Sequence, residues 1–165
     1  VQTMAAIAEQ AEKDRSALGD YEVPMNENCS QREFLAHAAI EATKTLGVAG
    51  IITDSLTGET VRHLAAFRGP NPILAICYKE KTQRWLNLSF GVIPVHQKEH
   101  APAAYMFTAA LRMLRQKGYI GSDDKIAYLS GSFGLGNPTG TTFLEINKVS
   151  QVFDKSYEFH LPNKE

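Results

Sequence analysis

Two segments rich in glycine and hydroxyl residues follow apolar runs, and their composition suits the binding of an anion. The first is TDSLTGET at residues 53–60, and the second lies within SGSFGLGNPTGTTFLE at residues 130–145. Gly, Ser and Thr leave backbone N–H groups unobstructed and add short hydroxyl donors, which together can surround a phosphate. The alternative is that both segments are ordinary turns at strand ends, where glycine and threonine are also common.

The candidate anion ligands are the hydroxyl residues and glycines of the two segments. They are Thr53, Ser55, Thr57, Gly58 and Thr60 in the first segment, and Ser130, Gly131, Ser132, Gly140 and Thr141 in the second. If the strands before these segments are neighbours, we expect the two sets to face one another across a shallow pocket. The helix after Gly58 would direct its positive end inward, so the pocket would favour a phosphomonoester.

Other chemistry finds little support in the sequence. No GxxxxGK[ST] motif occurs, and the glycine-rich segment precedes a strand pattern, FLEI, instead of a helix, so neither nucleotide triphosphate hydrolysis nor dinucleotide binding is predicted. His96 and His100 have a spacing that can hold a metal on a helix, but Pro94 and Pro102 favour a loop there. No nucleophile, base and orienting acid converge, and we predict no catalytic residue and no metal ligand in this chain.

Composition is typical of one globular domain with its own core. The chain has 165 residues, of which 44% are hydrophobic and 21% charged. The net charge of −1 predicts no attraction to nucleic acid or to an anionic membrane, and no apolar stretch reaches 18 residues. Cys29 and Cys77 have no CxxC spacing, which favours reduced thiols in a cytoplasmic protein.

Short apolar runs alternate with helical patterns along most of the chain. The runs lie at 49–53, 72–78, 92–95, 126–131 and 143–146, and the helical patterns at 30–46, 59–67, 80–90 and 102–117. This alternation predicts an α/β fold, a three-layer sandwich with a five-stranded, mostly parallel sheet and helices on both faces. The last strand should be antiparallel, because the connection at 132–140 is too short for a helical crossover.

Several local features refine this prediction. Ser30, with Glu33 three residues later, forms a capping box, and Gly47 ends the same helix. Trp85 is expected in the core or at an interface, in preference to a platform for stacking, because its helix is amphipathic. The tail at 150–165 alternates apolar and polar residues, which favours an edge strand or an interface arm, with disorder of its last residues as the alternative.

The opening segment, VQTMAAIAEQAEKDR, begins at full helical periodicity without a capping residue. We therefore expect the natural chain to start upstream of Val1. Residues 19–29 contain glycine, proline and asparagine without periodicity, and they are predicted to be a linker.

Five segments occur in a distinctive order, namely FLAHAAIEATKTLGVAGIITDS, TGETVRHLAAFRGPNPILAI, FGVIPV, ALRMLRQKGYI and SGSFGLGNPTGTTFLEI. Together they resemble the carboxy-terminal α/β domain of pyruvate kinase, here over residues 30–165, with the matching motifs between 30 and 148. Residues 1–18 resemble the end of the last helix of that family's catalytic barrel. The chain is therefore similar to a part of a longer enzyme.

The resemblance implies regulation and assembly for this part and catalysis elsewhere. The full-length enzyme would transfer phosphate from phosphoenolpyruvate to ADP, with Mg²⁺ and K⁺ held in the barrel and no cofactor in this domain. This domain would bind a phosphorylated effector, a sugar phosphate or a nucleotide, and would contribute to a cytoplasmic homotetramer. Thr53, Ser55, Gly58 and Thr60 match the family's first effector loop, and Ser130, Gly131, Gly140 and Thr141 fall in the second.

Glu59 departs from the family pattern, since an arginine is frequent at its position. At an effective dielectric of about 20, two like charges about 4 Å apart repel by on the order of 4 kcal/mol. A bound phosphate would therefore require Glu59 to turn away. The alternatives to an enzyme part are a free-standing α/β module that binds a phosphate ligand without enzymatic activity, and a small independent hydrolase.

Overall fold

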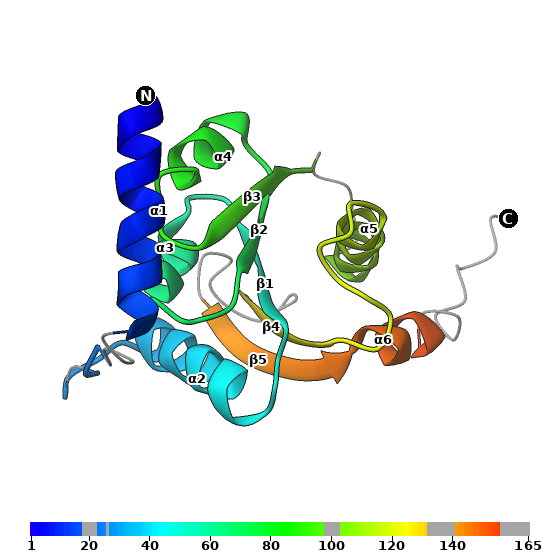
Figure 1. Ribbon diagram of the computed structural model, residues 1–165. Helices are drawn as coiled ribbons and strands as arrows, with labels where there is room; N and C mark the ends of the chain where they lie inside the picture. Colours follow the sequence, from blue (N-terminus) through cyan, green and yellow to red (C-terminus); the bar gives the residue numbers. More distant parts are fainter. Residues whose placement is uncertain (18–22, 26, 98–102, 132–140, 156–165) are drawn as a thin grey trace, which may run out of the picture.

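A five-stranded sheet forms the middle layer of the protein (Figure 1). The structure, a computed structural model, describes residues 1–17, 23–25, 27–97, 103–131 and 141–155. The strands are β1 (Gly50–Ser55), β2 (Ile73–Cys77), β3 (Val92–His96), β4 (Lys125–Gly131) and β5 (Thr141–Lys148), in the order β3-β2-β1-β4-β5. The first four are parallel and β5 is antiparallel to β4, which confirms the predicted sheet.

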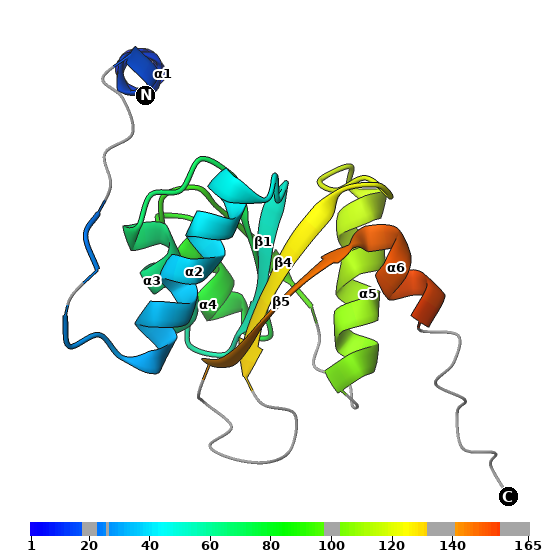
Figure 2. The ribbon, with the colours of Figure 1, turned by 90° about the horizontal axis from the view of Figure 1, so that it is seen from below.

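Helices cover both faces of the sheet (Figure 2). One face carries α2 (Gln31–Thr45), α3 (Glu59–Ala66) and α4 (Glu80–Leu86), and the other carries α5 (Ala103–Gln116) and α6 (Val149–Lys155). The remaining helix, α1 (Gln2–Ala17), lies apart from the sheet, and its apolar residues Met4 and Ile7 are exposed. The predicted three-layer sandwich is therefore correct.

Strand alternation divides the core between the two faces. Ile51 packs in a cluster with residues of α2 and α3, whereas the next residue, Ile52, packs with Leu111 and Leu114 of α5. Successive side chains of a strand point to opposite faces, so each central strand supplies both clusters. This alternation also decides which polar residues at the strand ends can meet.

Local hydrogen bonds set the start of α2 and the end of α4. The Ser30 hydroxyl accepts a hydrogen bond from the Glu33 N–H at 3.2 Å, so Ser30 caps α2 as predicted. The helix predicted over 80–90 ends earlier, at Leu86, because the Leu88 and Ser89 N–H groups bond to carbonyls three residues back instead of four.

The prediction of an edge strand in the tail is wrong for residues 150–155, which are helical. Val149 is fully buried and Val152 packs against the same cluster, and this three-residue spacing suits a helix lying on the core. The helix starts at once because the Val149 and Ser150 N–H groups bond to the carbonyls of Asp124 and Ser122. Residues 156–165 lie outside the described part of the chain.

The burial of Cys77 in β2 predicts that the free energy of unfolding depends on pH. Burial raises the pKa of its thiol from 9.0 to about 11. Folding therefore favours the protonated thiol, so this contribution to stability is complete below pH 9.0 and is lost as the pH rises towards about 11. Urea denaturation across this window should show a smaller decline for Cys77→Val than for the unaltered protein.

The control for this measurement is Cys29→Ser, because Cys29 is only partly buried. Cys29→Ser should keep the decline of the unaltered protein, while other titrating groups contribute equally to all three proteins. An identical decline in Cys77→Val would show that the thiol does not couple to folding.

Candidate phosphate-binding site

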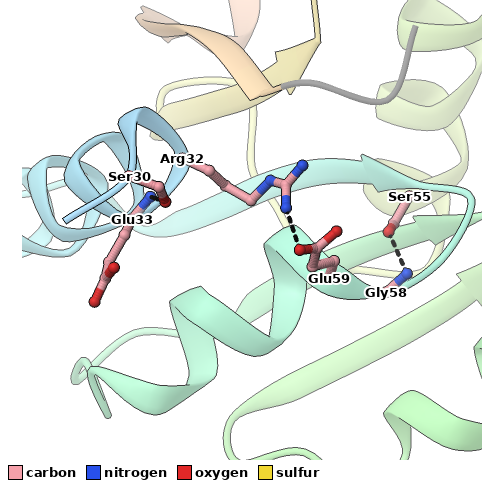
Figure 3. Close-up of polar contacts among 6 residues, drawn as sticks. All are labelled: Ser30, Arg32, Glu33, Ser55, Gly58 and Glu59. Carbon is pink, nitrogen blue, oxygen red and sulfur yellow. Dashed lines mark hydrogen bonds and ion pairs between the residues drawn. The ribbon is translucent and has the colours of Figure 1, made fainter. Parts of the chain in front are cut away.

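A tight turn joins β1 to α3 and contains the first set of predicted anion ligands. Ser55 ends β1, and its hydroxyl accepts a hydrogen bond from the Gly58 N–H at 2.7 Å (Figure 3). Gly58 has a φ of 84°, a left-handed conformation that glycine adopts without steric cost. The Thr82 hydroxyl of α4 donates to the Leu56 carbonyl at 2.9 Å, which holds the turn against α4.

The first set of predicted ligands divides into buried and accessible residues. The Thr53 side chain is fully buried, and Ser55 and Gly58 are also buried. Thr57 is exposed and Thr60 is half-buried at the first turn of α3. In this conformation Ser55 and Gly58 shape the turn, and an anion in solution would meet Thr57, Thr60 and the amino end of α3.

The neighbouring strand places Ser130 on the other face of the sheet. β1 and β4 are adjacent and parallel, as the predicted pocket requires, with Thr53 beside Leu129. Ser130 is the next residue after Leu129, and its hydroxyl donates to the Asp54 carboxylate. Because side chains alternate along a strand, Thr53 and Ser55 lie on the α3 face, and Asp54 and Ser130 lie on the α5 face.

The Asp54 carboxylate is the centre of a polar cluster that sequence reasoning missed. It accepts hydrogen bonds from Ser130 and, at 3.4 Å, from the Tyr78 hydroxyl of the segment after β2. Burial, and after it the charge of Asp54, raises the pKa of nearby Tyr128. The period of two residues between Thr53 and Ser55 was the signal that Asp54 points the other way.

Arg32 neutralises the negative charge of Glu59, which was expected to repel a phosphate. Its guanidinium reaches from the first turn of α2 and forms an ion pair with the Glu59 carboxylate (Figure 3). Glu59 is 50% exposed, and the pair places an arginine at the amino end of α3 from another helix. The pairing would offset the negative charge that Glu59 presents to an anion at this turn, and sequence alone carried no signal for the pair.

The second set of predicted ligands is described only in part. Gly131 ends β4 and pairs with Thr141 at the start of β5, next to an irregularity in the register between Ser130 and Gly131. The sheet therefore brings the two ends of this segment opposite one another. Ser132 and Gly140 lie outside the described residues. His100, which was considered with His96 as a metal ligand, also lies outside them.

The described residues contain no cluster of acidic, histidine or cysteine side chains of the kind that holds a metal ion. Among them, no three His, Cys, Asp or Glu side chains lie close enough together to hold a metal ion. The same part of the chain contains no helix with the length and apolar character needed to cross a bilayer.

Comparison with known proteins identifies the family. The family model described as "Pyruvate kinase, alpha/beta domain" matches residues 33–146. The chain belongs to this family of α/β domains. It is 31% identical over 154 residues to a pyruvate kinase of Borreliella burgdorferi, covering 92% of this chain and 32% of that protein.

Other pyruvate kinases also match this chain over only a part of their own length. It is 29% identical to a pyruvate kinase of Lactobacillus delbrueckii subsp. bulgaricus, covering 72% of this chain and 21% of that protein. A solved structure of Cryptosporidium parvum pyruvate kinase in complex with ADP shares the fold, with a TM-score of 0.68 and 22% identity over 76% of this chain and 25% of that one. The chain thus spans about a third or less of the length of these relatives.

Proposed function

We propose that this chain is the C-terminal regulatory and assembly part of a pyruvate kinase. The catalytic barrel, outside these residues, would transfer phosphate from phosphoenolpyruvate to ADP and would hold Mg²⁺ and K⁺. Residues 1–18 would end the last barrel helix, 19–29 would link the two parts, and 30–165 would form the regulatory domain. The family match over residues 33–146, together with relatives several times longer, supports this division.

We further propose that the carboxyl end of β1 binds a phosphorylated effector, either a sugar phosphate or a nucleotide. The strand order carries this proposal, since the chain proceeds from β1 to β2 and β3 on one side and then returns to β4 on the other. In open α/β sheets, ligands bind at the carboxyl ends of strands where the order reverses in this way. The amino end of α3 lies at that point, and Arg32 pairs the Glu59 charge there.

Assembly into a homotetramer is the second part of the proposed role. β5 lies at the edge of the sheet, where one side of its backbone pairs with no other strand of the described sheet. Such an edge is suited to contacts between copies of the chain. We propose that this edge contributes to assembly, and light scattering of the natural protein measures the oligomeric state directly.

The size of the natural polypeptide separates an enzyme part from a free-standing module. The present chain has a mass of 18.2 kDa. Immunodetection in cells should show a product roughly three times larger, because a barrel of about 250 residues and a lid would accompany it. A natural product near the mass of this chain would contradict the enzyme and leave the free-standing module.

Thermal denaturation tests effector binding. We expect fructose 1,6-bisphosphate, AMP, glucose 6-phosphate or ribose 5-phosphate to raise the melting temperature above that in sulfate. A ligand at about 100 times its dissociation constant stabilises by roughly 2.7 kcal/mol, which is a rise of several degrees for a domain of this size. Paired replacement of Thr57 and Thr60 by alanine should remove the rise, because both lie at the accessible end of the turn.

Thr45→Ala is the matched control, since Thr45 is an exposed threonine at the far end of α2. This variant should keep the full response to the effector. The absence of any rise in the unaltered protein would contradict effector binding at this turn, and an unchanged rise in the paired variant would place the site elsewhere.

A further inference from the structure

A hollow of about 210 Å³ lies beside the β1–α3 turn, between α3 and the end of α4. Its lining residues come from three segments and are Thr57, Arg62, Trp85, Leu86, Leu88 and Ser89. Leu86 is almost fully buried and packs against Gly58, so the hollow has an apolar base. Thr57 alone is shared with the proposed effector site, which otherwise uses different residues.

Two large apolar side chains at this hollow are exposed to solvent. Trp85 is 62% exposed, so the first of its two expected places, the core, is wrong, and the interface is not tested. Leu88 is 89% exposed. A single exposed leucine is ordinary on a protein surface, but a tryptophan and a leucine together beside a hollow are typical of a binding surface. The exposed part of the indole offers apolar surface for contact with a planar ring.

A cation stands over the same indole. The Arg62 guanidinium carbon lies 5.7 Å from the centre of the Trp85 ring, within the range of a cation–π interaction. This contact holds the guanidinium at the hollow, and its remaining N–H groups are suited to a carboxylate or phosphate.

The charges around the hollow favour an anion. None of its six lining residues is acidic. Glu59, one turn before Arg62 on α3, is paired with Arg32, and Glu80 of α4 is paired with Arg84 at 3.6 Å. The positive charge of Arg62 is therefore opposed by no carboxylate of the lining.

We propose that this hollow binds a small aromatic anion, with the ring against Trp85 and a carboxylate or phosphate substituent on Arg62. The volume limits the ligand to about one ring and its substituent, because sites that enclose a larger organic ligand measure roughly 300–1,000 Å³. Leu86 and Leu88 supply apolar contact for the ring edge, and Thr57 and Ser89 supply hydroxyl donors for the substituent. The proposal does not depend on effector binding at the β1–α3 turn.

Trp85 is the single tryptophan of these 165 residues, so the tryptophan fluorescence of this chain by itself reports on the hollow. Titration with benzoate and with phenyl phosphate should each give a saturable change in emission. Benzyl alcohol, which has the ring without the charge, should bind at least about tenfold more weakly, since a hydrogen bond to a charged group contributes about 1.5–3 kcal/mol. Inorganic phosphate, which has the charge without the ring, should give no comparable change.

Arg62→Gln tests the cation, and it should weaken benzoate binding by about tenfold or more. Arg84→Gln is the matched control, because Arg84 belongs to α4 but does not line the hollow. A melting temperature measured for each variant confirms folding, and Arg62→Lys, which keeps the charge, should retain part of the affinity.

Equal affinity for benzoate and benzyl alcohol would overturn the proposal, as would unchanged benzoate binding in a folded Arg62→Gln variant. No saturable change with either aromatic anion would also overturn it. The effector test stays distinct, because its sugar phosphates carry no aromatic ring and its paired variant includes Thr60, which does not line the hollow.

Discussion

Replacement of Leu64 by alanine should lower the free energy of unfolding by about 2–5 kcal/mol, as measured by urea denaturation. Leu64 lies on α3 and is 0% exposed, in the cluster that joins α2 and α3 to the sheet. Removal of its terminal carbons both loses apolar burial and leaves a cavity, because the neighbouring strands are fixed by their hydrogen bonds and can collapse only in part.

Leu88→Ala is the matched control, because it removes the same atoms from a leucine that is 89% exposed. It should change the free energy of unfolding by no more than about 0.5 kcal/mol. Equal losses in the two variants would mean that α3 does not pack on the sheet as the structure shows. A domain with a total stability of roughly 5–15 kcal/mol would lose a large part of it through Leu64.

Gly58→Ala should destabilise the protein by about 2–4 kcal/mol, for two separate reasons. The left-handed conformation at φ 84° is strained for any residue with a β-carbon. In addition, a β-carbon on Gly58 would lie 3.2 Å from the Leu86 Cδ2 atom, so the Leu86 side chain must move by a few tenths of an ångström in a packed environment. Thermal and urea denaturation measure the loss.

Gly118→Ala separates these two causes. Gly118 has a similar φ of 74°, but a β-carbon there would meet nothing within 4 Å. Its replacement should therefore cost only the conformational part, about 1–2 kcal/mol. If Gly58→Ala costs no more than Gly118→Ala, the contact between the turn and Leu86 is not tight, and the hollow beside it is less well formed than described.

The Gly58 variant also bears on the proposed effector site, because Gly58 joins the turn to the amino end of α3. If the added methyl group moves the turn away from Leu86, Thr57 and Thr60 will be displaced from the carboxyl end of β1. We expect the response to a phosphorylated effector to fall in Gly58→Ala while Gly118→Ala keeps it. This comparison uses the same melting measurement as the effector test, with stability differences subtracted for each variant.

The elements of the fold could be predicted from sequence because their signals are local. Apolar runs and helical spacing placed all five strands and the helices from Gln31 onward to within a few residues, apart from the end of α4 and the tail helix. The antiparallel last strand followed from a short connection, and the cap at Ser30 from a pair of residues three apart. The order of weak motifs indicated the family that the comparison then showed.

The side-chain arrangement at the candidate sites required the tertiary structure. Asp54 meets Ser130, 76 positions away, only because β4 lies beside β1, and a shift of one residue in register would turn one of them to the other face. The Arg32–Glu59 pair and the exposure of Trp85 likewise depend on how α2, α3 and α4 pack.

By itself, therefore, the sequence determined the strands and the helices other than the tail helix, since these arise from residues close together in the chain. The order of its motifs indicated the family, and its composition predicted two segments suited to an anion. Only the tertiary structure decided which hydroxyls are buried, which carboxylate is neutralised by an arginine, and where an accessible hollow forms. The physical reason is that local spacing specifies backbone conformation and burial preference, whereas charge pairing and cavity shape depend on strand order, register and helix packing.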